Sequence, residues 1–253
     1  MFKRMKKFLF VLVVIMTLTP LGTAEVIKLI DVPTALTLLR GYYDIEFVTY
    51  GNGGIQSKIA IGLTDRITLG ISEDIGGAIG NQKADWNIPG VIAKVNILYP
   101  NPDSIGMAIG YDALLSGEYG KAYNNQMTDD VVYGAYIAFS KQVSLFTGEQ
   151  HWHFGIRFPL LPFEARKGGK NISLYSGIYV IINDELSVFG EVENLYLFGG
   201  DRGKEMLFNV GVRYHFSETL SITFNFQYTS SREINSTDKP SRSLTIEYQN
   251  IFY

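Results

Sequence analysis

Two pairs of carboxylates, Asp44 with Glu46 and Glu191 with Glu193, are each spaced two residues apart in the sequence. In a strand this spacing puts both members of a pair on one face, where two carboxyl groups can share a proton and work as acid and base. Basic side chains that could neutralise them occur in other segments: Lys58, Arg157 and Arg213. Because an ion-pair network explains the carboxylates more simply than catalysis does, we predict no catalytic residues.

The three histidines of the chain are His151, His153 and His215. The stretch HWHFG places His151 and His153 on one face of a strand, where a facing carboxylate could complete a metal site. Spacing identifies no third ligand, so we predict no metal and no other cofactor, with His153 in a polar network and His151 near a rim. No GxSxG nucleophile elbow occurs, and we predict that the chain is not an enzyme, with a hydrolase as the alternative.

Short strands are the elements that would position these residues. Residues 220–229 read LSITFNFQYT, in which apolar side chains alternate with polar, uncharged ones. This period of two is that of a β-strand with one apolar and one polar face. From Leu39 onward the sequence divides into about twelve such segments of roughly ten residues, the length that a tilted strand needs to cross a bilayer. We predict them near residues 40–50, 54–63, 66–75, 90–99, 105–114, 131–140, 150–158, 171–182, 185–196, 205–216, 219–229 and 242–252.

The connections between these segments alternate in length. Odd-numbered connections such as LSGEYGKAYNNQMTDD are mostly long and polar, whereas even-numbered ones include TD, ND and SE, with one longer exception around Lys141 to Glu149. Outer-membrane barrels keep short turns on the periplasmic side and longer loops outside, while a soluble sandwich has no reason to sort its connections. The pattern therefore predicts an all-β fold, a transmembrane antiparallel up-and-down β-barrel of about 12 strands with short periplasmic turns and longer extracellular loops.

The two faces of the segments differ in charge. The face that we assign to lipid is apolar, as in Ile59, Ile71 and Val210. The opposite face lines the lumen and carries what we call the lumen polar network: Asp44, Glu46, Lys58, Lys94, Asp112, His153, Arg157, Glu191, Glu193, Arg213 and Glu247. Its acids and bases are nearly balanced, as confined charges must be, so we predict a narrow lumen filled by side chains.

The first 24 residues predict export. Four basic residues precede an apolar run from Phe8 to Leu18, and the small-residue triplet Gly22-Thr23-Ala24 follows, which is the pattern of a signal peptide spanning residues 1–24. Cleavage there removes four of the 22 basic residues and none of the 25 acidic ones, leaving a net charge of −7. An acidic exported chain is a poor partner for nucleic acid. We predict an outer-membrane location.

Residues 25–38 predict an N-terminal periplasmic or plug segment ahead of a barrel at 39–253. Pro33 supplies no backbone donor, so this stretch cannot form a ladder strand. The apolar VIKLI that precedes it favours a place inside the mouth of the barrel.

The stretch LIDVPTALTLLRGYYDIEF resembles the opening of YjbH-type outer-membrane β-barrels associated with exopolysaccharide, and the matching residues are Ile30, Asp31, Pro33, Thr34 and Ala35. The phrases IGLTDRITLGIS, IPGVIAKVNIL, GMAIGYDA and LSVFGEVEN look like strand and hairpin phrases of the same group. The resemblance implies a barrel with a structural or accessory role in the cell envelope and exopolysaccharide.

These features together predict a barrel with a narrow or plugged polar lumen. Its expected partners are outer-membrane lipid, lipopolysaccharide met by the basic stretch ARKGGK at 165–170, and the barrel assembly machinery, with polysaccharide as a further candidate. Two alternatives stay open: a small-solute, porin-like channel, and a soluble secreted β-sandwich or lipocalin-like carrier.

Overall fold

The computed structural model describes residues 26–81, 83–86, 89–112, 134–145, 148–159, 172–196, 206–230 and 241–252. No helix within these ranges is long and apolar enough to cross a membrane. The predicted signal peptide at residues 1–24 and the basic stretch at 165–170 lie outside the described residues.

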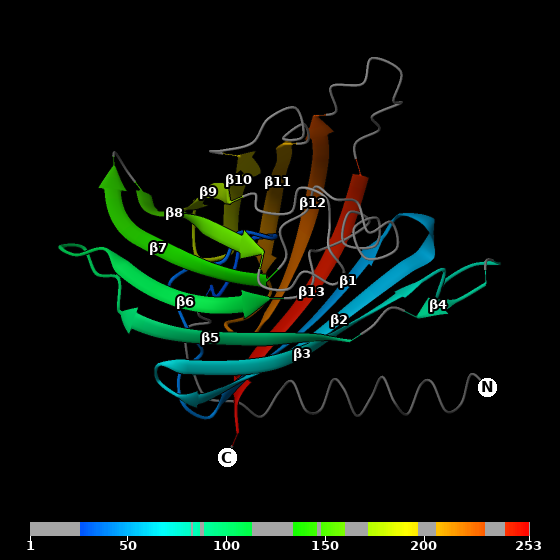
Figure 1. Ribbon diagram of the computed structural model, residues 1–253, viewed down its shortest axis with the longest axis horizontal. Helices are drawn as coiled ribbons and strands as arrows, with labels where there is room; N and C mark the ends of the chain where they lie inside the picture. Colours follow the sequence, from blue (N-terminus) through cyan, green and yellow to red (C-terminus); the bar gives the residue numbers. More distant parts are fainter. Residues whose placement is uncertain are drawn as a thin grey trace.

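Twelve long antiparallel strands form one closed sheet (Figure 1). Their bounds are β1 Tyr42–Tyr50, β2 Gly54–Thr64, β3 Ile67–Gly76, β5 Gly90–Leu98, β6 Gly106–Asp112, β7 Gly134–Leu145, β8 Gly148–Pro159, β9 Ser173–Ile181, β10 Leu186–Tyr196, β11 Met206–His215, β12 Leu220–Ser230 and β13 Ser241–Ile251. A short strand, β4 (Asp85–Trp86), extends the end of β3, and a single 3₁₀ turn, η1 (Gly51–Gly53), joins β1 to β2.

Closure of the sheet comes from the pairing of the first strand with the last. Strand β1 pairs with β13 from Tyr42 opposite Ile251 to Tyr50 opposite Ser243, and Figure 1 shows the red β13 beside the blue β1. Every other long strand pairs with its neighbour along the chain. The predicted transmembrane-type barrel of about 12 strands is therefore confirmed, and the β-sandwich alternative is wrong.

The short connections between strands lie at one rim of the barrel and the longer ones lie mostly at the other, as predicted. The connections at one rim are residues 65–66, 99–105, 146–147, 182–185 and 216–219, and those at the other are 51–53, 77–89, 113–133, 160–172, 197–205 and 231–240. The long connection predicted around Lys141 to Glu149 is wrong, because β7 and β8 stay paired as far as Leu145 and Gly148. The Gln142 amide donates to the Glu149 carboxylate across this extended hairpin. This contact supports the pairing of β7 with β8 beyond the part of the barrel whose outer face is apolar.

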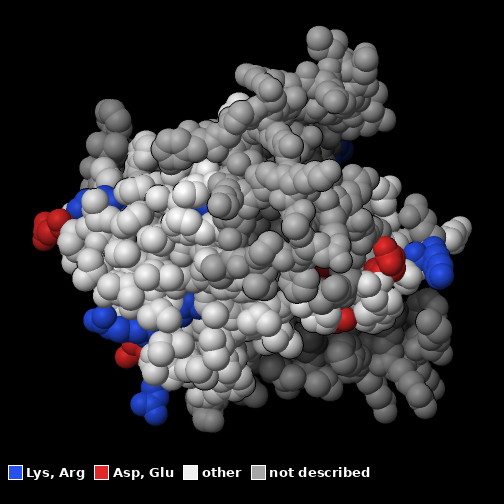
Figure 2. All heavy atoms as spheres, viewed as in Figure 1, with Lys and Arg blue, Asp and Glu red and all other residues white. Residues whose placement is uncertain are grey.

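Side chains on the outer face of the barrel are apolar and exposed. Ile71, Val210 and Phe224 have exposed fractions of 62%, 57% and 56%. On the face shown in Figure 2, the charged side chains of the described residues are few and lie mainly near the edges. A continuous apolar exterior of this kind is stable against lipid and not against water, which excludes the soluble-carrier alternative.

Aromatic rings gather at the rim with the short turns. The ring centroids of Tyr43 and Phe252 lie 4.5 Å apart, and those of Tyr214 and Phe216 lie 4.8 Å apart. Amphipathic rings of this kind favour the depth of the lipid headgroups. This rim therefore lies at one membrane interface.

Replacement of Phe224 by Arg is expected to destabilise the barrel by about 2–4 kcal/mol, because the side chain sits near the middle of β12 on the lipid face. The matched change Tyr228→Arg, close to the end of the same strand, should cost about 0–1 kcal/mol. Chemical unfolding in lipid vesicles measures both changes. Equal losses at the two positions would contradict the assignment of the faces.

The hydrophobic core lies inside the barrel, where residues 26–41, the N-terminal segment, pack against the inner wall. Leu29, Ile30 and Val32 are buried in a cluster with aromatic side chains of β7, β9 and β10: Tyr136, Tyr175, Tyr179 and Phe189. Glycine permits the close approach at Gly62, where an added Cβ would clash with the backbone carbonyl oxygens of Leu38 and Leu39. The small residue on the wall thus makes room for the N-terminal segment.

Candidate functional site in the barrel lumen

The N-terminal segment forms a narrow hairpin within the lumen. The Leu29 N–H donates to the Val32 carbonyl at 3.0 Å, and the Thr34 N–H donates to the Ile27 carbonyl at 3.2 Å. Lys28 and Pro33 lie opposite each other as an antiparallel bridge. Buried backbone N–H groups need hydrogen-bond partners. Those of Ile30, Asp31 and Val32, at the tip of the hairpin, have a partner in a side chain of the barrel wall.

Glu191 on β10 holds the tip. Its carboxylate accepts the backbone N–H groups of Ile30, Asp31 and Val32 at 3.1, 2.9 and 3.1 Å. The Asn209 side-chain amide donates to the same carboxylate at 2.6 Å. Successive N–H groups that converge on one anion form a backbone nest, so the segment itself stabilises the Glu191 carboxylate.

Arg157 on β8 forms a second clamp at the tip. Its guanidinium donates to the Glu193 carboxylate at 2.9 Å and to the Asp31 carbonyl at 2.7 Å. It also lies over the Tyr175 ring, 5.4 Å from the centroid. A buried ion pair of this kind requires such additional partners to offset the cost of removing both charges from water.

The return arm of the hairpin is held by β3, β5 and β7. The Ala35 N–H donates to Ser140 Oγ at 2.7 Å, and the Leu38 N–H donates to Thr68 Oγ1 at 2.9 Å. Lys94 Nζ donates to the carbonyl oxygens of Leu36, at 3.0 Å, and Ile27. The wall thus binds the segment mainly through its backbone.

Two further ion pairs lie in the lumen, closer to the rim with the short turns than the hairpin tip does. Lys28 of the segment pairs with Glu46 at 2.7 Å, and Arg213 pairs with Glu247 at 3.2 Å. Lys28 Nζ also donates a hydrogen bond to the Glu46 carboxylate, so this pair tethers the segment to β1.

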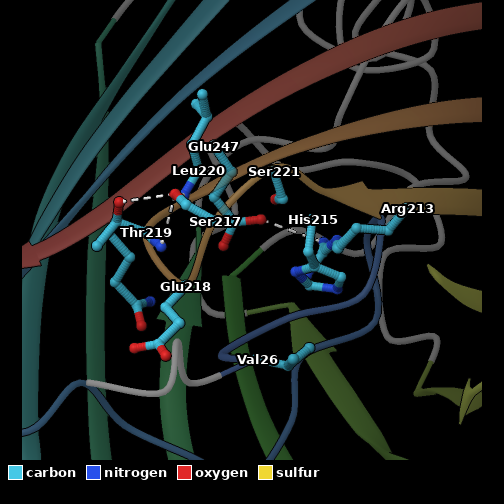
Figure 3. Close-up of a pocket in the computed structure, with 10 residues that line it drawn as sticks. Val26, Arg213, His215, Ser217, Glu218, Thr219, Leu220, Ser221 and Glu247 are labelled. Atoms are coloured by element: carbon cyan, nitrogen blue, oxygen red, sulfur yellow. Dashed lines mark hydrogen bonds and ion pairs between the residues drawn. The ribbon is translucent and has the colours of Figure 1, made fainter. Parts of the chain in front are cut away.

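The residues of the predicted lumen polar network fall into separate groups. Around the tip lie Arg157, Glu191 and Glu193, and around the return arm lie Lys94 and His153. A small cavity of about 30 Å³, with room for about two waters, brings together Asp44, Glu46, Lys58, Lys94 and Asp112. Arg213 and Glu247 form a pair of their own near Val26 (Figure 3).

The backbone of residues 26–41 is the partner that sequence reasoning missed. Charge balance along the wall suggested that wall acids meet wall bases, but Glu191 meets backbone N–H groups and Glu46 meets Lys28 of the segment. Uncharged anchors such as Ser140 and Asn209 were also missed. The only signal for them was Pro33 with the apolar residues before it, which predicted that the segment enters the barrel.

The histidines serve as hydrogen-bonding groups in the described structure. His153 Nδ1 lies 2.7 Å from Ser140 Oγ, His151 Nε2 lies 3.0 Å from Glu149, and His215 Nε2 lies 3.2 Å from Ser187 Oγ. No group of three or more metal-ligating side chains forms among the residues that the structure describes.

His215 and Ser217 are two residues apart in the sequence, a spacing that could place a histidine base beside a serine nucleophile. Ser217 Oγ accepts the backbone N–H groups of Thr219 and Leu220 and contacts the Thr219 hydroxyl, as Figure 3 shows. The hydroxyl thus caps the turn between β11 and β12. It does not form the nucleophile–base hydrogen bond that a hydrolase needs.

Replacement of Glu191 by Gln is expected to loosen the tip of the hairpin, because an amide group lacks the charge and turns a donor toward the three N–H groups. The expected cost is about 1–3 kcal/mol, the penalty for buried donors left unsatisfied. Hydrogen exchange of the amides of Ile30, Asp31 and Val32 should accelerate about tenfold or more. The change Glu218→Gln in an exposed turn is the control, and unchanged exchange in the Glu191 variant would contradict the clamp.

Comparison with known proteins identifies the fold. No family model and no curated protein matches the sequence. A solved structure, the KdgM porin in complex with disordered oligogalacturonate, matches with a TM-score of 0.51 and 13% identity over 84% of this chain and 99% of that one. The Acinetobacter baumannii outer membrane protein Omp33 has a TM-score of 0.47 and 7% identity, covering 85% of this chain and 100% of that one.

The likeness to the KdgM porin shows a shared fold, the closed antiparallel barrel of outer-membrane proteins. Together with the apolar exterior, it identifies the chain as an outer-membrane β-barrel protein, as predicted. The finer resemblance to YjbH-type barrels is carried by short sequence phrases alone and stays a prediction.

Proposed function

We propose that this protein is an outer-membrane barrel kept closed by its own N-terminal segment, with a structural or accessory role in the cell envelope and exopolysaccharide of the kind the YjbH-type resemblance implies. The observation that carries the first part is the occupied lumen. Val32, Ala35 and Leu38 of the segment are fully buried inside the barrel. A segment packed in this way leaves no wide aqueous path beside it within the described residues.

The charges in the lumen argue against a permanently open pathway for acidic sugars such as the oligogalacturonate bound by the KdgM porin. The bases of the wall are already engaged, since Arg157 pairs with Glu193 and Arg213 pairs with Glu247. An anionic solute would have to displace these carboxylates and enter a lumen in which acids outnumber bases.

A small-solute channel that opens when the N-terminal segment moves is the second candidate. The inner face of β12 and the first half of the inner face of β13 favour it, because they are uncharged and hydrophilic, with Asn225 donating to Ser243 and Thr245. Such a wall can be hydrated if the hairpin leaves. The hairpin itself is held by hydrogen bonds and ion pairs, which are reversible contacts.

Two measurements test these functions. Planar-bilayer recording of the full mature chain should show a mostly closed state, and a sustained, wide conductance would overturn the closed barrel. In the source bacterium, loss of the gene should alter the amount or release of exopolysaccharide. An unchanged polysaccharide would reject the accessory role and leave the closed barrel standing. We also propose lipopolysaccharide, the barrel assembly machinery and polysaccharide as partners of this protein.

A further inference from the structure

We propose that the periplasmic mouth of this barrel binds a small solute that carries primary amines. The proposed site is a cavity of about 750 Å³ between the N-terminal segment and the ends of β8 to β11 at the rim with the short turns. Val26 and Leu36 of the segment form one side, and Tyr179, His215 and Phe216 belong to the other. A volume of this size is typical of small-ligand sites. The site goes beyond the proposed function, because it is present while the barrel is closed.

The charge of the cavity selects the class of ligand. Its lining contains four acidic residues, Glu149, Asp184, Glu185 and Glu218, and no lysine or arginine. The nearby Arg213 is already paired with Glu247, and Figure 3 shows this pair beside His215 and Val26. A cation is attracted to such a mouth, and the faces of aromatic rings favour it further.

The aromatic side chains of the mouth are held in place by hydrogen bonds. The Tyr179 hydroxyl donates to Ser187 Oγ at 2.8 Å, and the Tyr214 hydroxyl donates to Glu185 at 3.2 Å. Tyr179 and Ile181 give the cavity an apolar surface beside its acids, and the Tyr214 ring lies on the outer face of the same rim. An alkyl amine matches both parts, since its stem packs on the rings while its ammonium groups meet the carboxylates.

An independent observation at the base of the cavity points to a bound donor or acceptor. His153 lines the cavity, its side chain is only 1% exposed, and its Nε2 atom has no hydrogen-bond partner among the described residues. Buried polar atoms are rarely left in this state. Its other nitrogen, Nδ1, lies 2.7 Å from Ser140 Oγ.

Ser140 connects this histidine to the N-terminal segment. Ser140 Oγ accepts the Ala35 N–H at 2.7 Å and has a second lone pair that can accept a hydrogen bond from the N–H of His153 Nδ1. In that tautomer His153 Nε2 is an acceptor, which fits the N–H of an ammonium group. The ligand and the segment therefore meet through His153 and Ser140.

Nuclear magnetic resonance of the mature chain in lipid nanodiscs tests the site, with histidine labelled by ¹⁵N. Only three histidines contribute signals, and all three line the cavity. Putrescine should shift them saturably and bring His153 Nε2 to the frequency of an unprotonated acceptor nitrogen. Butanediol, which has the same stem and no charge, should not. No shift, an equal shift with butanediol, or a protonated Nε2 at saturation would overturn the proposal.

Charge variants sharpen the test. The double change Glu185→Gln and Glu218→Gln removes two acids of the cavity and should weaken putrescine binding about fivefold. The matched control is Asp103→Asn in the turn between β5 and β6, an exposed acid that does not line the cavity. Equal weakening by the control would show general attraction to an acidic protein and reject the site. Neither the NMR titration nor the charge variants measure conductance. The result for this binding site is therefore independent of the test of the closed barrel.

Discussion

Deletion of residues 26–36 is expected to raise the single-channel conductance of the barrel about tenfold or more, from a mostly closed state to a steady open one. The deletion removes Val32 and Ala35 from the lumen, together with Lys28, which tethers the segment to Glu46. The strands begin only at Tyr42, so the ladder between β1 and β13 is untouched. What remains is a barrel whose inner wall is mostly polar, with one aromatic patch on β7, β9 and β10, and water can enter it.

The deletion also leaves buried charges without their partners, and the design must separate opening from unfolding. Glu191 loses three N–H donors and Arg157 loses the Asp31 carbonyl, although water in the opened lumen can replace them. Heat-dependent migration on gels and circular dichroism should show that the shortened protein is still a barrel. A folded variant with unchanged conductance would contradict the role of the segment.

A glycine–serine replacement of residues 26–36 at constant length is the matched control. It keeps the chain but removes the side-chain packing in the core cluster and the tether at Lys28. We expect intermittent opening, because a flexible linker can enter the lumen without being held there. Behaviour identical to that of the intact chain would indicate that bulk alone blocks the lumen.

Replacement of Arg157 by Met is expected to destabilise the protein by about 3–5 kcal/mol, which is the cost of breaking a buried ion pair from one side. Glu193 would be left charged at a site that is almost completely buried, and the Asp31 carbonyl would lose its donor. The packing of the guanidinium over Tyr175 would also change. Unfolding by guanidinium chloride in lipid vesicles measures the loss.

The double variant Arg157→Met with Glu193→Gln identifies the cause. It removes both charges, so most of the lost stability should return, since a neutral pair does not carry the desolvation cost of a lone carboxylate. Arg242→Met, on the exposed face of β13, is the control for the substitution type and should cost little. A double variant as unstable as the single one would show that the packing of Arg157 matters and the ion pair does not.

The strands and their faces could be predicted because their signal is local. The alternation in residues 220–229 predicts β12 with Phe224 toward lipid and Asn225 toward the lumen, and the structure has both. The error at Lys141 to Glu149 has a local cause as well. There the hairpin of β7 and β8 continues beyond the apolar band, so its residues alternate less clearly while the ladder persists to Leu145.

The contacts of the candidate site could not be predicted in the same way. The sequence placed Glu191 on the lumen face, yet its partners are backbone atoms of Ile30, Asp31 and Val32, about 160 residues away along the chain. Backbone N–H groups are present at every residue except proline, so no residue type announces which of them will be left for a carboxylate. Lys28 and Glu46 pose the same difficulty, because each has several possible partners of opposite charge.

By itself, the sequence determined the alternating faces, the count of strands and the side on which turns are short, because each follows from residue types at fixed local spacings. It also indicated that residues before Pro33 would not join the sheet. Only the tertiary structure decided what those residues do. Closure of β1 on β13 creates an enclosed space, and in that space the hairpin of residues 26–41 satisfies Glu191, Arg157 and Lys94 through contacts that exist only when distant strands surround it.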